Sequence, residues 1–257
     1  FRRFGAKALD GHPTPATPFV KLSTGASGVG FASSIGLAVG AVDRYGADAP
    51  RVHIVEGEGG LTPGRVAEAL AAAGTASLRN VVVHLDWNQA SIDSDRVCRE
   101  GDLPGDYVQW DPRELFSLHD WNVIDVRDGH DLQQVLAAQR RALQLDTGQP
   151  TAIVYRTVKG WRYGVEGKAS HGAGHKFCSE GYHAALSELV ELSRTTGVAP
   201  DLPVCSPDDP RCAGADGAAA REECFWATLE AVRAQVRALP EMTAALAQRL
   251  AAARDRL

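Results

Sequence analysis

The segment RVHIVEGEGG at residues 51–60 begins with β-branched residues and ends on glycines and glutamates, and NVVVHLDWNQ at residues 80–89 has a similar pattern. Short segments of this kind predict buried strands, and the Ala-rich residues between them predict a helix. A strand, a helix and a second strand in this order form a βαβ unit with parallel strands. The two segments therefore predict an α/β fold.

The same alternation continues on both sides of this unit. We expect strands at residues 51–56, 80–86, 121–126 and 150–158, and helices at residues 28–43, 64–73, 112–118 and 131–145. Asp131 follows a Gly-His pair and can cap the last of these helices. The predicted fold is a parallel β-sheet flanked by helices, in which ligands bind beyond the carboxyl ends of the strands.

The C-terminal part of the chain has a different composition. The expected segments are a loop rich in Gly, His and Lys at residues 160–180, a helix at 180–194, a linker rich in Pro, Asp, Gly and Ala at 195–220, and helices near 222–239 and 241–257. A loop as long as the first of these is typical of a functional segment. We therefore expect an α/β domain at residues 1–195, followed by a linker and a C-terminal helical extension at residues 196–257.

Composition and charge exclude several classes of protein. The 257 residues are 44% hydrophobic, and 27 Lys and Arg against 32 Asp and Glu give a net charge of -5, which is not typical of a nucleic-acid-binding protein. No apolar stretch is long enough to span a membrane and no secretory signal is visible, so we expect a cytoplasmic protein. The five scattered cysteines predict free thiols, with a disulfide between Cys205 and Cys212 as the alternative.

Polar residues follow two of the predicted strands. Glu58 lies between glycines after the first strand, and Asn88 and Ala90 follow the second. Mg²⁺ prefers a carboxylate, carbonyl oxygens, water and the phosphate oxygens of its ligand. Glu58, the side-chain oxygen of Asn88 and the carbonyl near Ala90 could supply such a set. The alternative is that Glu58 belongs to a solvated turn.

Two further segments could contact a ligand. Residues 23–30, STGASGVG, begin an apolar helix whose N-terminal N–H groups could bind phosphate. The alternative is a tight turn that allows close helix packing. Residues 157–175 carry His171 and His175 among glycines, where an imidazole can act as a donor or a base. Zinc binding by the two histidines is the alternative, although the sequence places no third ligand.

These motifs, taken in order, resemble the thiamine diphosphate half of transketolases. The resemblance covers roughly residues 4 to 190. Its motifs are the GHP of residues 11–13, residues 23–30, the GEG of residues 57–59 with Asn88, the DGHD of residues 128–131, and the TVKG of residues 157–160 with His171 and Gly172. The same architecture is similar to that of the homodimeric pyruvate dehydrogenase decarboxylase component and of deoxyxylulose-phosphate synthase.

The resemblance implies a thiamine-diphosphate-binding fold of the diphosphate type, with a defined Mg²⁺ site. Glu58, Asn88 and the Ala90 carbonyl would hold the Mg²⁺ that neutralises the diphosphate, and Gly59 would lie against the diphosphate.

The resemblance also assigns roles around the reacting centre. His171 would touch the diphosphate near that centre, and His12 would line the substrate channel, so these two histidines are the expected catalytic residues. Gly25, Ala26 and Ser27 would pack against the cofactor ring, and Lys159 would support the loop that carries His171.

The sequence departs from the family pattern at three positions of the diphosphate segment. Glu58 stands where the family usually has Asp, so an extra methylene must be accommodated. Gly60 and Pro63 stand where family members commonly have an acid, and at the Pro63 position that acid helps to couple the two active sites of transketolases.

The resemblance also implies a partner and a reaction. The family's pyrimidine-binding domain is absent from the sequence, so we expect a separate pyrimidine-binding subunit and an α2β2 assembly. The expected reaction transfers a two-carbon ketol or acyl unit from a ketose or 2-oxo acid donor to an aldehyde-type acceptor. The alternatives are a 2-oxo-acid decarboxylating component of a dehydrogenase-type complex and a degenerate, non-catalytic subunit.

Overall fold

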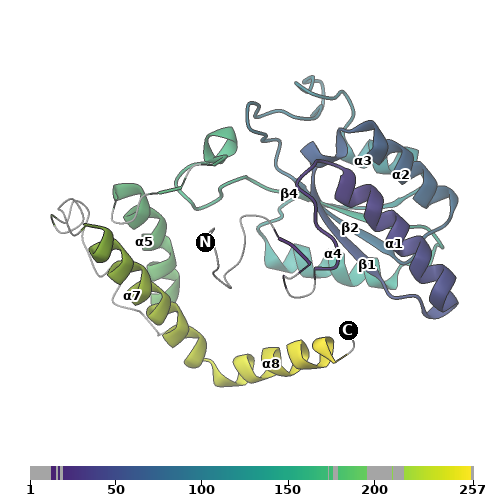
Figure 1. Ribbon diagram of the computed structural model, residues 1–257. Helices are drawn as coiled ribbons and strands as arrows, with labels where there is room; N and C mark the ends of the chain where they lie inside the picture. The colour runs from purple at the N-terminus through teal and green to yellow at the C-terminus, as the bar shows by residue number, and fades with distance from the viewer. Residues whose placement is uncertain are drawn as a thin grey trace. The chain divides into compact units, whose positions relative to one another are not determined.

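The computed structural model describes residues 13–15, 17, 20–172, 174–175, 179–195, 210 and 217–255. These residues fall into two compact units (Figure 1). The first lies within Phe1–Lys159 and Gly167–His171, and the second within Gly160–Glu166 and Gly172–Leu257. The expected domain boundary after residue 195 stays a prediction.

The first unit contains a four-stranded parallel sheet in the order β1-β2-β4-β3. Its strands are β1 (Val52–Gly57), β2 (Val81–Trp87), β3 (Asn122–Val126) and β4 (Thr151–Arg156), so all four predicted strands are confirmed. Gly57 pairs with Asp86, and Asp86 pairs with Tyr155. This register aligns the carboxyl ends of β1, β2 and β4, so the loops after these strands leave the sheet along one edge.

The predicted helices of this unit are also confirmed. They are α1 (Val29–Tyr45), α2 (Gly64–Thr75), α3 (Pro112–Leu118) and α4 (Leu132–Gln144), with short 3-10 helices η1 (Gly46–Asp48), η2 (Glu58–Leu61) and η3 (Gly167–Ser170). Asp131 caps α4 as expected, because its side chain accepts hydrogen bonds from the main-chain N–H groups of Gln133 and Gln134. Asp111 and Glu114 form a reciprocal capping box at the start of α3.

Helices α1, α2 and α3 cover one face of the sheet and form the main core. Its largest buried side chains include Phe31, Leu70 and Phe116, which join Val83 and Val154 of the strands. On the opposite face, a smaller cluster combines α4 with residues of β2, β3 and β4. This cluster leaves part of the second face open, and Val55 of β1 is 80% exposed there.

The second unit contains α5 (Glu180–Thr195), α7 (Gly217–Arg237) and α8 (Pro240–Arg254), which confirms the three predicted helices. Helix α7 begins five residues before the predicted start at 222, because residues 217–220 are Gly-Ala-Ala-Ala and continue the helix. Within the described ranges, no helix is long and apolar enough to cross a membrane. Cys98 is a buried free thiol as predicted, whereas the Cys205–Cys212 loop lies outside the described residues.

Candidate active site

The three predicted metal ligands come together at the carboxyl ends of β1 and β2. Glu58 begins η2 directly after β1, and its Oε2 accepts a hydrogen bond from the main-chain N–H of Asn88 at 3.2 Å. The Asn88 amide donates to Asp86 Oδ2 at 2.8 Å, and its Oδ1 accepts from the main-chain N–H of Ala90 at 2.8 Å. These bonds fix the loop after β2 against η2.

Glu58 carries a buried carboxylate with one unsatisfied oxygen. The residue is 2% exposed, and its Oε1 has no hydrogen-bond partner. Burial raises the pKa of Glu58 to about 7, and the nearby Asp86 carboxylate adds to this, although main-chain hydrogen bonds, including that from Asn88, oppose it. A buried carboxylate is costly without a partner, and a bound cation would supply one.

The donor set at this edge fits Mg²⁺ better than zinc. In the part of the chain that the structure describes, no group of three His, Cys, Asp or Glu residues is arranged around a metal position. The available ligands are one carboxylate, one amide oxygen and one main-chain carbonyl, which are hard oxygen donors. Such a site needs further oxygens from its ligand, as magnesium sites for phosphate compounds commonly do.

The glycines around Glu58 leave space for a ligand at one position and for a neighbouring side chain at another. A Cβ on Gly59 would meet no atom within 4 Å, so this backbone is open on one side. A Cβ on Gly60 would instead collide with the carboxylate of Glu56. A side chain at position 60 would therefore require the Glu56 carboxylate to move.

The predicted ring-contacting residues Gly25, Ala26 and Ser27 lie in an exposed loop before α1. Gly28, which caps α1, has a φ of 75°, and a Cβ there would lie 2.7 Å from Val66 Cγ2. The turn and close-packing interpretation is therefore correct for Gly28. Gly25 to Ser27 remain predicted cofactor contacts.

His171 and Lys159 are brought together after β4. Lys159 Nζ lies 2.9 Å from His171 Nδ1 and 3.5 Å from the main-chain oxygen of Ser91. Because an ammonium only donates, Nδ1 of His171 accepts this hydrogen bond and its Nε2 carries the proton. The exposed His171 thus presents an N–H donor, as a diphosphate oxygen would require. His12, the other predicted catalytic histidine, lies outside the described residues.

The zinc alternative for His171 and His175 gains no support. Among the described residues, no third His, Cys, Asp or Glu is placed with these histidines to complete a metal site. Nε2 of His175 lies 2.6 Å from the carbonyl oxygen of Tyr163, which is in the same unit as His175. This ring nitrogen already has a hydrogen-bond partner.

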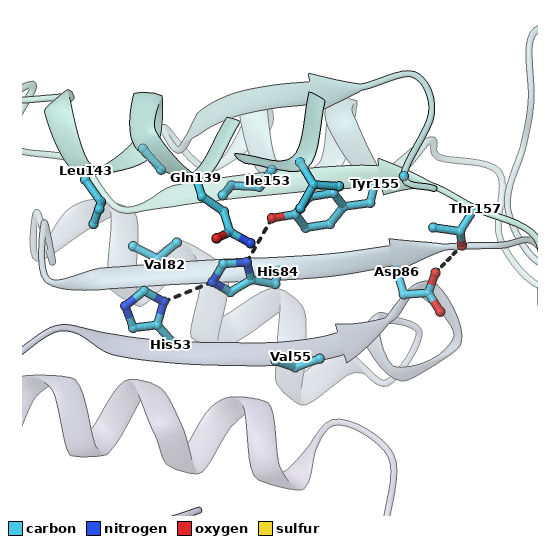
Figure 2. A pocket seen from close by; sticks show the side chains of 13 residues that line it. His53, Val55, Val82, His84, Asp86, Gln139, Leu143, Ile153, Tyr155 and Thr157 are labelled. Atoms are coloured by element: carbon cyan, nitrogen blue, oxygen red, sulfur yellow. Dashed lines mark hydrogen bonds between the residues drawn. The ribbon is translucent and has the colours of Figure 1, made fainter. Parts of the chain in front are cut away.

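A row of polar side chains on the open sheet face was not predicted. It lines a pocket of about 620 Å³, and Figure 2 shows it running across β1, β2 and β4. Nδ1 of His53 lies 2.9 Å from Nε2 of His84, and Nδ1 of His84 lies 3.0 Å from the Tyr155 hydroxyl. Burial lowers the pKa of both histidines, which favours neutral rings.

The same pocket reaches the candidate metal site through two residues that sequence reasoning also missed. Asp86 and Thr157 line its end, and the Thr157 hydroxyl donates a hydrogen bond to Asp86 Oδ1. Asp86 accepts from Asn88 with its other oxygen. In the sequence, the only sign that Asp86 supports Asn88 was its position two residues before it.

Comparisons with known proteins agree on one family. The sequence profile of a family described as "Transketolase, thiamine diphosphate binding domain" matches residues 1–253. The chain is 32% identical over 189 residues to a transketolase of Buchnera aphidicola, which covers 67% of this chain and 26% of that protein. It is 34% identical over 167 residues to a transketolase of Homo sapiens, with coverage of 64% and 25%.

A solved structure shows the same fold. The transketolase from Leishmania mexicana superposes with a TM-score of 0.54 at 22% identity, and the match covers 92% of this chain and 33% of that chain. This chain spans about a quarter of the length of the curated relatives that it matches.

Proposed function

The chain belongs to the transketolase family of thiamine diphosphate binding domains, and from this premise we propose that it is the diphosphate-binding component of a transketolase-like transferase. The reaction proposed is transfer of a two-carbon ketol or acyl unit from a ketose or 2-oxo acid to an aldehyde-type acceptor. The observation that supports it most strongly is the buried Glu58 carboxylate, which has an unsatisfied oxygen next to Asn88.

We propose that Glu58, Asn88 and the Ala90 carbonyl hold Mg²⁺ against the diphosphate. Gly59 leaves open space beside these residues, and the N–H of His171 Nε2 is available to donate to an anionic oxygen. Bound thiamine diphosphate supplies the carbon nucleophile of the reaction. The chain's own residues bind and orient the diphosphate, and His171 holds a proton at Nε2.

A separate pyrimidine-binding subunit is proposed as the partner, in an α2β2 assembly. This proposal rests on the resemblance to transketolases, in which a pyrimidine-binding domain completes the cofactor site. His12 is proposed to line the substrate channel of the assembled site.

The test is calorimetric titration of thiamine diphosphate with Mg²⁺ against the full chain, alone and together with the product of the adjacent gene. We expect binding that is lost in Glu58→Ala and Asn88→Ala and kept in Glu68→Ala, which removes an exposed glutamate from α2. Turnover of a ketose phosphate, with an aldehyde acceptor, would support the transferase.

Other results of this experiment would contradict the proposal. Absence of binding by the wild-type pair would indicate a non-catalytic subunit. Binding combined with decarboxylation of pyruvate, without transfer to an aldehyde, would indicate the 2-oxo-acid decarboxylating alternative. Equal affinities of the Glu58, Asn88 and Glu68 variants would show that the cofactor binds elsewhere.

A further inference from the structure

The loop that follows β2 carries the candidate metal ligands at its start and Asp95 further along. Asn88 and Ala90 belong to the candidate metal site described above. Asp95 lies further along the same loop, and its side chain is 54% exposed. Its contacts are with η3, the turn that immediately precedes His171.

The Asp95 side chain binds the first peptide group of η3. Its Oδ1 accepts a hydrogen bond from the main-chain N–H of Lys168 at 2.6 Å, and its Oδ2 lies 4.0 Å from the Lys168 ammonium. The same Oδ1 lies so close to Gly167 that a Cβ there would collide with it. Gly167 also has a φ of 64°, so glycine is favoured at this position by both its backbone conformation and the approach of Asp95.

The turn transmits this contact to His171. The Gly167 N–H donates to the Lys159 carbonyl at 3.0 Å, and the Ser170 hydroxyl donates to the Gly167 carbonyl at 2.7 Å. The His171 N–H donates to the Lys168 carbonyl at 3.0 Å. His171 is therefore attached by its main chain to the residue whose N–H Asp95 binds.

We infer that Asp95 is a positioning residue that holds the His171 imidazole against the Lys159 ammonium. A role of Asp95 in catalysis rests on the proposed function of His171. Its effect on the position of the His171 imidazole does not depend on that function. The loop after β2 contacts the His171 segment twice, through Asp95 and through the Ser91 carbonyl beside Lys159. The loop that carries the candidate metal ligands thus also sets the position of the histidine.

The test compares Asp95→Ala with Asp95→Asn, because the Asn side-chain oxygen can still accept from the Lys168 N–H. Asp102→Ala is the matched control, since it removes an exposed acid from the same loop. The first readout is the ¹⁵N NMR spectrum of histidine-labelled full chain, with His171 assigned from a His171→Gln variant. We expect one tautomer, protonated at Nε2, in wild type, Asp95→Asn and Asp102→Ala, and a mixture of tautomers in Asp95→Ala.

The second readout is affinity for thiamine diphosphate with Mg²⁺, measured with the partner subunit present. We expect about tenfold weaker binding for Asp95→Ala, the size of one lost charge-assisted hydrogen bond at a partly exposed site. Asp95→Asn should recover most of this affinity. In a His171→Gln background, Asp95→Ala should cause no further loss, because the two residues act through one contact.

The two readouts separate failure of this inference from failure of the proposed function. An unchanged His171 spectrum in Asp95→Ala would overturn the positioning role, and so would an equal loss of affinity in Asp95→Asn and Asp95→Ala. A wild-type protein that binds no thiamine diphosphate would overturn the proposed function, while the NMR comparison still tests Asp95. If Asp95→Ala lowers the melting temperature strongly, Gly167→Ala is the replacement test, because its new Cβ would push the Asp95 carboxylate away from the Lys168 N–H. The same mixture of His171 tautomers is then expected.

Discussion

Glu58→Gln should remove a pH-dependent loss of stability that the buried carboxylate imposes on the metal-free protein. Burial moves the pKa of Glu58 from its ordinary 4.5 to about 7 in the folded protein. A change of this size corresponds to about 3 kcal/mol of unfolding free energy. Glutamine has nearly the same shape and carries no charge, so the substitution isolates this electrostatic cost.

The sign follows from which state holds the proton. Between pH 4.5 and about 7 the folded protein keeps the Glu58 proton that the unfolded chain has already lost. The unfolding free energy of the metal-free wild type should therefore fall by about 3 kcal/mol through this window, relative to Glu58→Gln, and stay constant above it. Any packing cost of glutamine is independent of pH, so it displaces the curve without changing its slope.

Urea denaturation of both proteins in the presence of a chelator, from about pH 4 to about pH 8, measures this difference. Excess Mg²⁺ with thiamine diphosphate should then stabilise the wild type near pH 8 and leave Glu58→Gln unchanged, because binding to the folded state adds to stability. Parallel curves for the two metal-free proteins would refute the reasoning. They would show that the Glu58 carboxylate is already compensated without a cation.

Three further outcomes test separate parts of the first unit. Asn88→Ala should weaken binding of thiamine diphosphate with Mg²⁺ at least about tenfold in calorimetry, because it removes a ligand and its hydrogen bonds. Gly28→Ala should lower the unfolding free energy by about 2 kcal/mol in urea, since φ is 75° and the new Cβ would meet Val66. The pKa values of His53 and His84 lie below 6.5, so folding opposes their protonation and stability should fall as pH drops below 6.5. His84→Phe should reduce that fall in urea titrations at about pH 5 and about pH 7.

The strands and helices were predictable because their signals are local. The β-branched residues of β2 and the Asp131 cap of α4 act within a few residues of themselves. The meeting of Glu58 and Asn88 was also predictable, since parallel strands bring their carboxyl ends to one edge of the sheet. Only this general rule of parallel sheets was needed.

The missed contacts depend on register and on loop paths, which the sequence does not display. His84 meets His53 and Tyr155 because β2 lies between β1 and β4 in the sheet. The neighbour of β2 is thus β4 and not β3, the next strand along the chain. Asp95 meets Gly167 only because two loops far apart in the chain run side by side. A lone aspartate and a lone glycine carry no sign of that pairing.

The contacts of Glu58 and Glu56 show how the protein accommodates two of its departures from the family pattern. One oxygen of the Glu58 carboxylate accepts a hydrogen bond from the main-chain N–H of Asn88, which joins η2 to the loop after β2. Its other oxygen stays unsatisfied and available to a cation. The space beside Gly60 is occupied by the carboxylate of Glu56, which accepts a hydrogen bond from the Gly57 N–H at 3.0 Å. An acid of β1, Glu56, thus lies beside the Gly60 position. The glutamate at position 58 is thus compatible with a working metal site, and its substitution for the usual aspartate is by itself no reason to infer a loss of catalysis.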